Sequence, residues 1–184
     1  MDRKHYFSRG SALIYTMVFM TIMIIIGLGS VNFSSLEQRT AGSFRVQQQA
    51  FVAAESILLE AELCVKDETR CSDLPLFDGN CTNGLCFSGT ERNSTVLCES
   101  GVTSPWEQGD VWRDSSRYIN ATSVGSTVTG RYIVEFMCYV PKNPFGVTPD
   151  PTKAAEWSRL YRITALSVMD SDGARVMLQS TYKL

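Results

Sequence analysis

The chain contains 21 consecutive residues that carry no formal charge, Ser11–Val31. An α-helix needs about 20 predominantly apolar residues to cross the hydrocarbon core of a bilayer. Arg3, Lys4 and Arg9 precede this run, and basic residues that flank a membrane helix mark its cytoplasmic side. The sequence therefore predicts a cytoplasmic N-terminus, a transmembrane helix at residues 11–31 and export of the rest of the chain.

Length and charge limit what the exported part can be. The chain has 184 residues, which is in the size range of a single domain, and the roughly 150 residues after the apolar run are enough to bury one core. The formal net charge is −2, whereas a surface that follows nucleic-acid phosphates needs an excess of Lys and Arg. We therefore expect one exported globular domain and no nucleic-acid partner.

The helical pattern continues beyond the apolar run. Residues 32–63 contain no Pro and one Gly, Gly42, so that residues 11–63 would form about 80 Å of helix at 1.5 Å per residue. Three- and four-residue steps predict that the second half is amphipathic. The predicted buried stripe is Phe33, Leu36, Thr40, Phe44, Gln47, Phe51, Ala54 and Leu58, and the opposite side carries Glu37, Arg39, Arg45, Gln48 and Glu55.

All six cysteines follow the predicted transmembrane helix: Cys64, Cys71, Cys81, Cys86, Cys98 and Cys138. An even number of cysteines in an oxidising compartment indicates disulfides. The competing interpretation is a zinc site, but no pair has CxxC spacing and the only histidine is His5. Of the fifteen possible pairings, we expect Cys64 with Cys71, Cys81 with Cys86, and Cys98 with Cys138; the first two close short loops and the third ties a loop to a strand.

The N-terminal segment has three possible interpretations. It could be a secretory signal peptide with a small-residue cleavage site at Gly27-Leu-Gly29, an uncut membrane anchor, or a leader cut on the cytoplasmic side before Ser11. A discarded signal peptide does not need to continue into the helix that follows it. The uninterrupted helical pattern through residue 63 therefore favours the cytoplasmic cut.

Several segments resemble known pilus proteins. The junction Arg9-Gly10 followed by Ser11-Ala12-Leu13-Ile14 is similar to the leader of type IV pilins and pseudopilins. The resemblance implies that a membrane peptidase cuts between Gly10 and Ser11 and methylates the new N-terminus at Ser11. Five further segments resemble the PilX-type minor pilins: Leu36–Gly42, Gln49–Glu55, Arg131–Glu135, Tyr161–Ala165 and Val176–Tyr182.

One position departs from the usual pilin pattern. Most pilins have Glu at the fifth residue after the cleavage site, and here that position holds Tyr15. In the family, this Glu offsets the positive N-terminus of the adjacent subunit in apolar surroundings, where an unpaired charge is unfavourable. A subunit at the filament tip has no subunit ahead of it and does not need the Glu. Tyr15 therefore suggests a position at or near the tip, although it could also mark a poorly incorporated subunit.

The globular part, residues 64–184, has its strongest strand signals at its end. Tyr132, Val134, Phe136, Cys138 and Val140 alternate within the predicted strand Arg131–Val140. Strands at Leu160–Met169 and Ala174–Tyr182 follow, joined by a turn at residues 170–173. Shorter predicted elements are strands at Asn83–Phe87 and Ser94–Glu99 and a helix at residues 105–116. The predicted fold is α+β: a long N-terminal helix packed on a C-terminal antiparallel sheet, which is also the pilin fold.

The sequence contains no catalytic constellation, so we expect no enzyme activity, cofactor or metal. The sole histidine is in the leader, and no phosphate-binding loop is present. The resemblance implies the following organisation: leader 1–10, transmembrane half 11–31, amphipathic half 32–63 and globular domain 64–184.

The resemblance also implies a function. The chain would be an inner-membrane prepilin with a periplasmic C-terminal domain, and later part of an extracellular pilus. It would prime pilus assembly with other minor pilins and the major pilin, lie near the tip, and support adhesion and twitching motility, in part through a tip adhesin. Two alternatives remain: a minor pseudopilin of a type II secretion system, or a secreted or anchored disulfide-bonded binding module.

Overall fold

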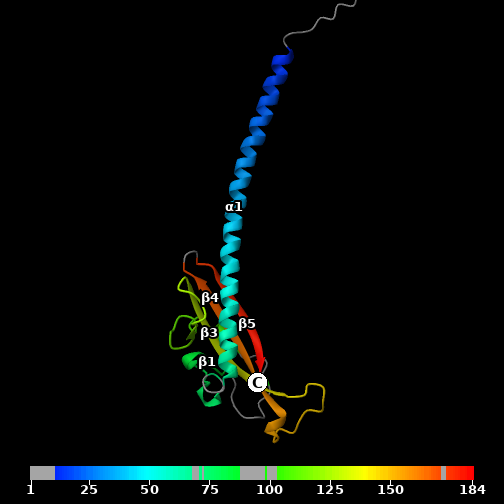
Figure 1. Cartoon of the computed structure of the whole chain (residues 1–184). Helices are drawn as coiled ribbons and strands as arrows, with labels where there is room; N and C mark the ends of the chain where they lie inside the picture. The colour runs from blue at the N-terminus through cyan, green and yellow to red at the C-terminus, as the bar shows by residue number, and fades with distance from the viewer. Residues whose placement is uncertain (1–10, 68–70, 72, 88–97, 99–102, 171–172) are drawn as a thin grey trace, which may run out of the picture. The chain divides into compact units, whose positions relative to one another are not determined.

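The computed structural model describes residues 11–67, 71, 73–87, 98, 103–170 and 173–184, with the side chains of residues 11 and 29–35 left out. The chain forms two compact units, residues 1–45 and 46–184. One helix, α1 (Ser11–Lys66), supplies the described part of the first unit and the beginning of the second (Figure 1). The predicted long N-terminal helix is therefore confirmed.

The second unit contains a mixed five-stranded sheet in the order β1-β3-β4-β5, with β2 also paired to β3. β3, β4 and β5 form an antiparallel meander, and β1 runs parallel to β3. β1 and β2 share the outer edge of β3, where Leu85 faces Val134 and Ile119 faces Tyr132. The strands span Leu85–Cys86 (β1), Ile119–Asn120 (β2), Val128–Pro141 (β3), Trp157–Met169 (β4) and Arg175–Lys183 (β5). The predicted α+β fold is confirmed, with three long strands close to their expected positions.

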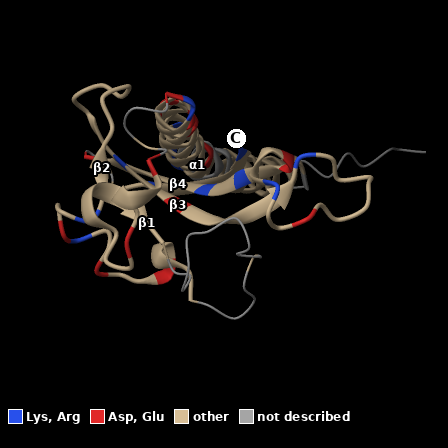
Figure 2. Cartoon of the chain, turned by 90° about the horizontal axis from the view of Figure 1, so that it is seen from below, with Lys and Arg blue, Asp and Glu red and all other residues tan. Residues whose placement is uncertain are grey.

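The main core lies between one face of the sheet and the C-terminal part of α1 (Figure 2). The helix contributes a stripe of mostly small side chains, and the sheet contributes aromatic and branched side chains. The fully buried helix residues are Ala50, Ala54, Ile57, Ala61 and Val65. Their spacing of four, three, four and four residues is that of a single helix face.

Among the described side chains, the predicted buried stripe is therefore wrong except at Ala54 and, in part, Leu58; the side chain of Phe33 lies outside the described residues. Phe51 is exposed, and so are Leu36 and Phe44 in the first unit. The physical reason is the close approach between helix and sheet. The Ser167 hydroxyl of β4 donates directly to the carbonyl of Ala50 at 2.6 Å, and a Cβ atom at Gly130 of β3 would lie 2.8 Å from Cδ1 of Ile57, so glycine there makes room for this larger side chain. The other fully buried helix residues are alanines and a valine, and larger side chains such as Phe51 lie on the outer faces of the helix.

A bulge in β3 changes the alternation that the sequence predicts. Tyr132, Val134 and Phe136 face the main core as expected. The register then shifts between Phe136 and Cys138, and it is Tyr139 that packs edge-on against Phe136, with ring centroids 5.4 Å apart. Extending the alternating face through Cys138 and Val140 was therefore wrong, because a bulge moves the following side chains to the opposite face.

The other face of the sheet is covered in part by a second, smaller core. Cys81, Cys86, Val111 and Ile133 are buried together, with tryptophan and tyrosine side chains against them. The predicted helix at residues 105–116 is wrong: only Pro105–Glu107 form a 3-10 turn. The loop that follows bends repeatedly so that Val111 reaches the sheet, which a continuous helix over these residues would not allow.

The smaller predicted elements have mixed outcomes. The strand expected at Asn83–Phe87 is shorter, because Asn83 adopts a left-handed conformation (φ 55°) and pairing is limited to Leu85–Cys86. Gly173 closes the turn between β4 and β5 with φ 64°, a conformation that glycine adopts without strain. The strand expected at Ser94–Glu99 falls largely outside the described residues.

Three disulfides join the cysteines in the expected pairs. Cys64 binds Cys71 and Cys81 binds Cys86, with sequence separations of 7 and 5 residues. Cys98 binds Cys138 of β3 across 40 residues. Cys64 lies in the last turns of α1, and the Cys81–Cys86 disulfide closes the turn that leads into β1.

Candidate assembly surface on the N-terminal helix

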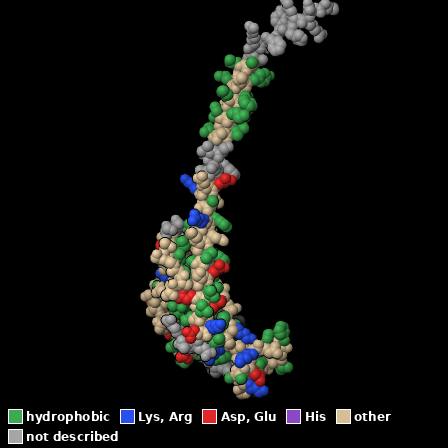
Figure 3. Space-filling view, in the orientation of Figure 1, with side chains coloured by type: hydrophobic (Ala, Val, Ile, Leu, Met, Phe, Trp, Pro, Cys, Tyr) green, Lys and Arg blue, Asp and Glu red, His purple; other side chains and the backbone are tan. Residues whose placement is uncertain are grey.

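Apolar side chains surround α1 over residues 13–28 of the first unit. Their exposed fractions lie between 48% and 74% over residues 13–28. Figure 3 shows these side chains along the upper segment of the helix. The set is Leu13, Ile14, Tyr15, Met17, Val18, Phe19, Met20, Ile22, Met23, Ile24, Ile25, Ile26 and Leu28. A soluble monomer rarely exposes a continuous apolar surface of this kind, so it marks a contact with other apolar groups.

The two threonines within this apolar segment are satisfied by the helix itself. The hydroxyl of Thr16 donates to the carbonyl of Leu13 at 2.9 Å, and the hydroxyl of Thr21 donates to the carbonyl of Met17. Hydrogen bonds of this kind, to a carbonyl of the preceding helical turn, allow Ser and Thr to lie in apolar surroundings without an unpaired hydroxyl. The segment can therefore be buried by apolar partners with little polar penalty.

The sequence-predicted leader residues are placed as follows. Gly10 lies outside the described residues, and Ser11 is the first residue of α1. Tyr15 is 74% exposed, among the apolar residues of the first helical turns. Among the described residues, no helix is both long and apolar enough to span a membrane.

The part of α1 that belongs to the second unit has its own exposed apolar residues. Phe51, Val52, Leu59 and Leu63 point away from the sheet and are 40–58% exposed. The sequence pattern identified Phe51, but as a buried residue, and it missed the other three. A second apolar periodicity, at positions 52, 59 and 63, could have identified these three exposed residues. It becomes visible once the stripe of small residues is assigned to the core.

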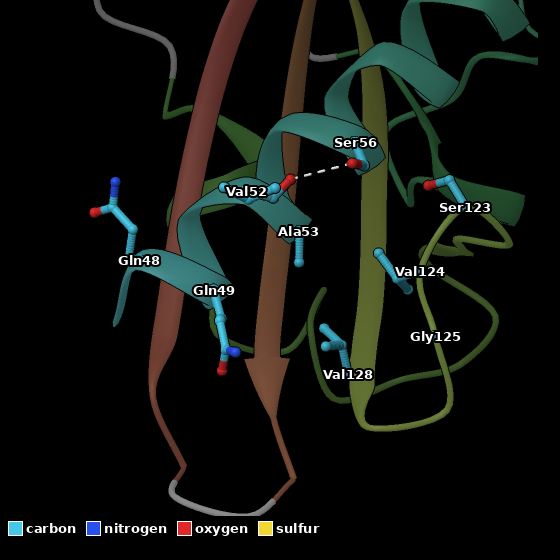
Figure 4. A pocket seen from close by; sticks show the side chains of 9 residues that line it. All are labelled: Gln48, Gln49, Val52, Ala53, Ser56, Ser123, Val124, Gly125 and Val128. Atoms are coloured by element: carbon cyan, nitrogen blue, oxygen red, sulfur yellow. Dashed lines mark hydrogen bonds between the residues drawn. The ribbon is translucent and has the colours of Figure 1, made fainter. Parts of the chain in front are cut away.

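A groove of about 370 Å³ runs beside this part of the helix (Figure 4). One wall is α1 from Gln48 to Ser56, and the other is the loop before β3, with Val124 and Val128 pointing inward. Ser56 does not offer its hydroxyl to the groove, because it donates to the carbonyl of Val52 at 3.1 Å. The groove is mainly apolar, and it extends the exposed apolar surface of the helix.

Glu60 holds the groove's loop against α1. Its carboxylate accepts hydrogen bonds from the backbone amide of Thr122 at 2.9 and 3.1 Å, from the Thr122 hydroxyl at 3.0 Å and from the amide of Ser123 at 2.8 Å. Partial burial alone would raise the pKa of Glu60. The hydrogen bonds from Ser123 and Thr122 stabilise the charged form more strongly and lower the pKa below its ordinary value.

This contact predicts a pH dependence of stability. Because the pKa of Glu60 is lower in the folded state, its contribution is complete above the unfolded pKa, about 4.3. It is lost as the pH falls through the folded pKa. We expect the free energy of unfolding, from urea titrations of the full chain in detergent between pH 3 and 7, to fall less steeply with acid in Glu60→Gln than in wild type. Glu55→Gln, on the same helix, is the control; equal flattening in both variants would contradict the assignment to Glu60.

Two family profiles match this chain. The profile described as "Type IV pilus assembly protein PilX C-term" covers residues 82–184, and the profile described as "PilX N-terminal" covers residues 9–58. No curated protein and no solved structure gives a match. The first profile spans more than half of the chain, including all five strands, and the second spans most of α1. The chain therefore belongs to the PilX family of type IV pilus assembly proteins.

Proposed function

We propose that this chain is a minor pilin that primes type IV pilus assembly and is incorporated near the filament tip, where it supports adhesion and twitching motility. Membership of the PilX family makes it a structural component of pilus assembly, located in the pilus or the cell envelope and associated with other pilus components. The finer role rests on α1. The observation that carries it is the apolar surface that surrounds α1 over residues 13–28.

This surface suits two successive environments. Before assembly it would lie in the inner membrane, with the N-terminus cytoplasmic and the second unit in the periplasm. The prepilin peptidase would cut between Gly10 and Ser11 on the cytoplasmic side and methylate Ser11. After assembly it would pack against the helices of other minor pilins and the major pilin. Glycines support close packing: a Cβ at Gly27 or Gly42 would meet no described atom within 4 Å, so nothing within this chain requires glycine there. Small residues allow helices of neighbouring subunits to approach.

The tip position rests on Tyr15. A methylated N-terminus remains a cation, and burying it among apolar helices is unfavourable unless a carboxylate offsets the charge. Tyr15 offers a phenol in place of a carboxylate, so this subunit cannot neutralise the N-terminus of a subunit ahead of it. At the tip no such subunit exists, and the disulfide-bonded loops of the second unit would face outward toward a tip adhesin or a surface.

The test compares filament composition in three strains. Filaments are sheared from cells that express wild type, Tyr15→Glu or the matched control Tyr15→Phe, and the number of copies per length of filament is measured by quantitative mass spectrometry. We expect Tyr15→Glu to raise the copy number several-fold, because each added carboxylate can accept another N-terminus, and Tyr15→Phe to keep the wild-type level. The same spectra should show a chain that begins at N-methylated Ser11.

Three outcomes would contradict the proposal. Equal copy numbers in Tyr15→Glu and wild type would remove the argument for the tip. A chain that starts at Ser30, or at Met1 with none in the filaments, would indicate a secreted or anchored binding module. A correct start at Ser11 without pilus association, together with a loss of protein secretion on deletion, would indicate a pseudopilin of a type II secretion system.

A further inference from the structure

The face of the sheet opposite α1 is left partly uncovered at β4 and β5. Two adjacent rows of side chains cross this face in register. In one row Arg131 lies beside Leu166 and Leu166 beside Met177; in the next, Val168 lies beside Arg175. The loop at residues 109–113 covers the β3 end of these rows, while Arg175 and Met177 on β5 stay exposed.

Between the loop and these rows lies a cavity of about 680 Å³. We call it the arginine groove and define it by Trp112, Arg113, Arg131, Leu166, Arg175 and Met177. Three arginines therefore line one concave site, although they come from a loop, a central strand and the edge strand. This volume is in the range of sites that hold a small ligand.

None of the three groove arginines forms an ion pair among the described residues. The ion pairs in the described part of the chain are Lys153–Glu156 and Arg162–Glu135, and neither involves a groove residue. Asp114, next to Arg113 in the sequence, accepts from Ser116, and Asp170 accepts from the Thr129 hydroxyl at 3.0 Å.

Arg131 is the fixed member of the set. Its Nη1 donates to the carbonyl of Trp112 at 2.7 Å, and its guanidinium carbon lies 4.6 Å from the centre of the Tyr118 ring. Its Nε is enclosed and has no acceptor among the described residues. A half-buried guanidinium with these contacts is held in place before a ligand arrives, so less conformational entropy is lost on binding.

The rest of the lining is mainly apolar. Trp112, Leu166, Val168 and Met177 lie in the same groove as the three arginines, together with Gly109 and Thr129. The Thr129 hydroxyl donates to Asp170. A ligand that suits this lining has an anionic group and an apolar face within a few ångströms of each other. A carboxylated sugar ring fits this description, because the C–H groups on one side of the ring form an apolar face and the carboxylate accepts paired hydrogen bonds from guanidinium.

We propose that the arginine groove binds an acidic saccharide, with the carboxylate of a uronic acid between the arginines and the sugar ring against Trp112, Leu166 and Met177. A nucleic acid fits less well. Recognition of its backbone requires basic residues along a track and an excess of positive charge, whereas here the arginines converge on one cavity in a chain with a net charge of −2. The proposal is independent of where in a pilus the chain lies.

The test measures binding to the full chain in non-ionic detergent micelles by calorimetric titration. The probe is a trisaccharide of mannuronic acid, compared with neutral mannotriose and with oligothymidylate. We expect saturable binding of the uronate trisaccharide with a Kd of roughly 1 mM or lower and much weaker binding of mannotriose. Arg113→Gln/Arg175→Gln should weaken uronate binding at least about tenfold, the effect of losing charge-assisted hydrogen bonds.

Lys153→Gln is the matched control, because it removes one exposed positive charge outside the groove; it should change the Kd less than twofold. Arg113 and Arg175 are themselves exposed, so the double variant should keep the wild-type near-ultraviolet circular dichroism spectrum. Absence of saturable uronate binding, equal binding of mannotriose, or an unchanged Kd in the double variant would each overturn the proposal. Binding of oligothymidylate in place of uronate would assign the groove to nucleic acid and overturn it as well.

Discussion

Replacing Phe136 by alanine is expected to lower the free energy of unfolding by about 3–5 kcal/mol. Phe136 is fully buried at the centre of the main core. Its ring contacts Phe77, Phe87, Tyr139 and Tyr161, with centroid distances from 5.4 to 6.4 Å. These neighbours come from a loop, from β3 and from β4, so the cavity left by alanine cannot be closed by a shift of one element.

Phe145→Ala is the matched control for this prediction. It removes the same side chain from a position that is 96% exposed, where substitutions usually change stability by less than about 0.5 kcal/mol. Urea unfolding of the full chain in detergent, followed by tryptophan fluorescence, measures both variants. A loss below about 1 kcal/mol for Phe136→Ala, or equal losses in the two variants, would contradict the placement of Phe136 at the core centre.

Removing the Cys98–Cys138 disulfide should have the second large effect, a loss of about 4 kcal/mol. A disulfide stabilises a fold chiefly by restricting the unfolded chain, and the restriction grows with the length of the closed loop. This pair is 40 residues apart, whereas Cys64–Cys71 and Cys81–Cys86 are separated by 7 and 5. The same relation predicts about 2–3 kcal/mol for either short loop.

The comparison needs paired substitutions, so that no free thiol remains. Cys98→Ala/Cys138→Ala is measured against Cys64→Ala/Cys71→Ala by urea unfolding under non-reducing conditions, and intact mass confirms that the other disulfides are oxidised. If the Cys64–Cys71 variant loses as much stability as the Cys98–Cys138 variant, loop length is not the dominant factor. A peptide map under non-reducing conditions would detect non-native disulfides in either variant.

The sequence predicted the long helix and the three long strands because their local patterns are strong. Residues 11–63 lack proline, and the segments that become β3, β4 and β5 are rich in aromatic and branched residues bounded by turn residues. The pattern could not show which face of α1 is buried. The predicted stripe contains both Phe51 and Ala54, and only Ala54 is buried. The close contact between α1 and the sheet, where the Ser167 hydroxyl donates to the carbonyl of Ala50 at 2.6 Å, comes from the tertiary structure and not from the local pattern.

The candidate sites were predictable to different degrees. The leader junction and Tyr15 lie close together in the sequence, so a resemblance to a family was enough to propose them, and both stay predictions. The arginine groove was not visible in this way. Arg131 and Arg175 are 44 positions apart, and the strand register places them on the same face of the sheet. Arg113 lines the same cavity because residues 108–116 form a bent loop where a helix was predicted.

The attachment of α1 to the sheet also has a mechanical consequence. Ser167 donates to the carbonyl of Ala50 at 2.6 Å, Glu60 holds Thr122 and Ser123, and Ser180 donates to Glu62 at 2.8 Å. A pull on the chain before Ala50 enters the globular unit through this helix. Because these hydrogen bonds are spread along α1, such a pull loads them together in shear, and they share the tension instead of rupturing one after another. The contacts of α1 with β4, β5 and the loop before β3 should therefore resist a pull on the helix together.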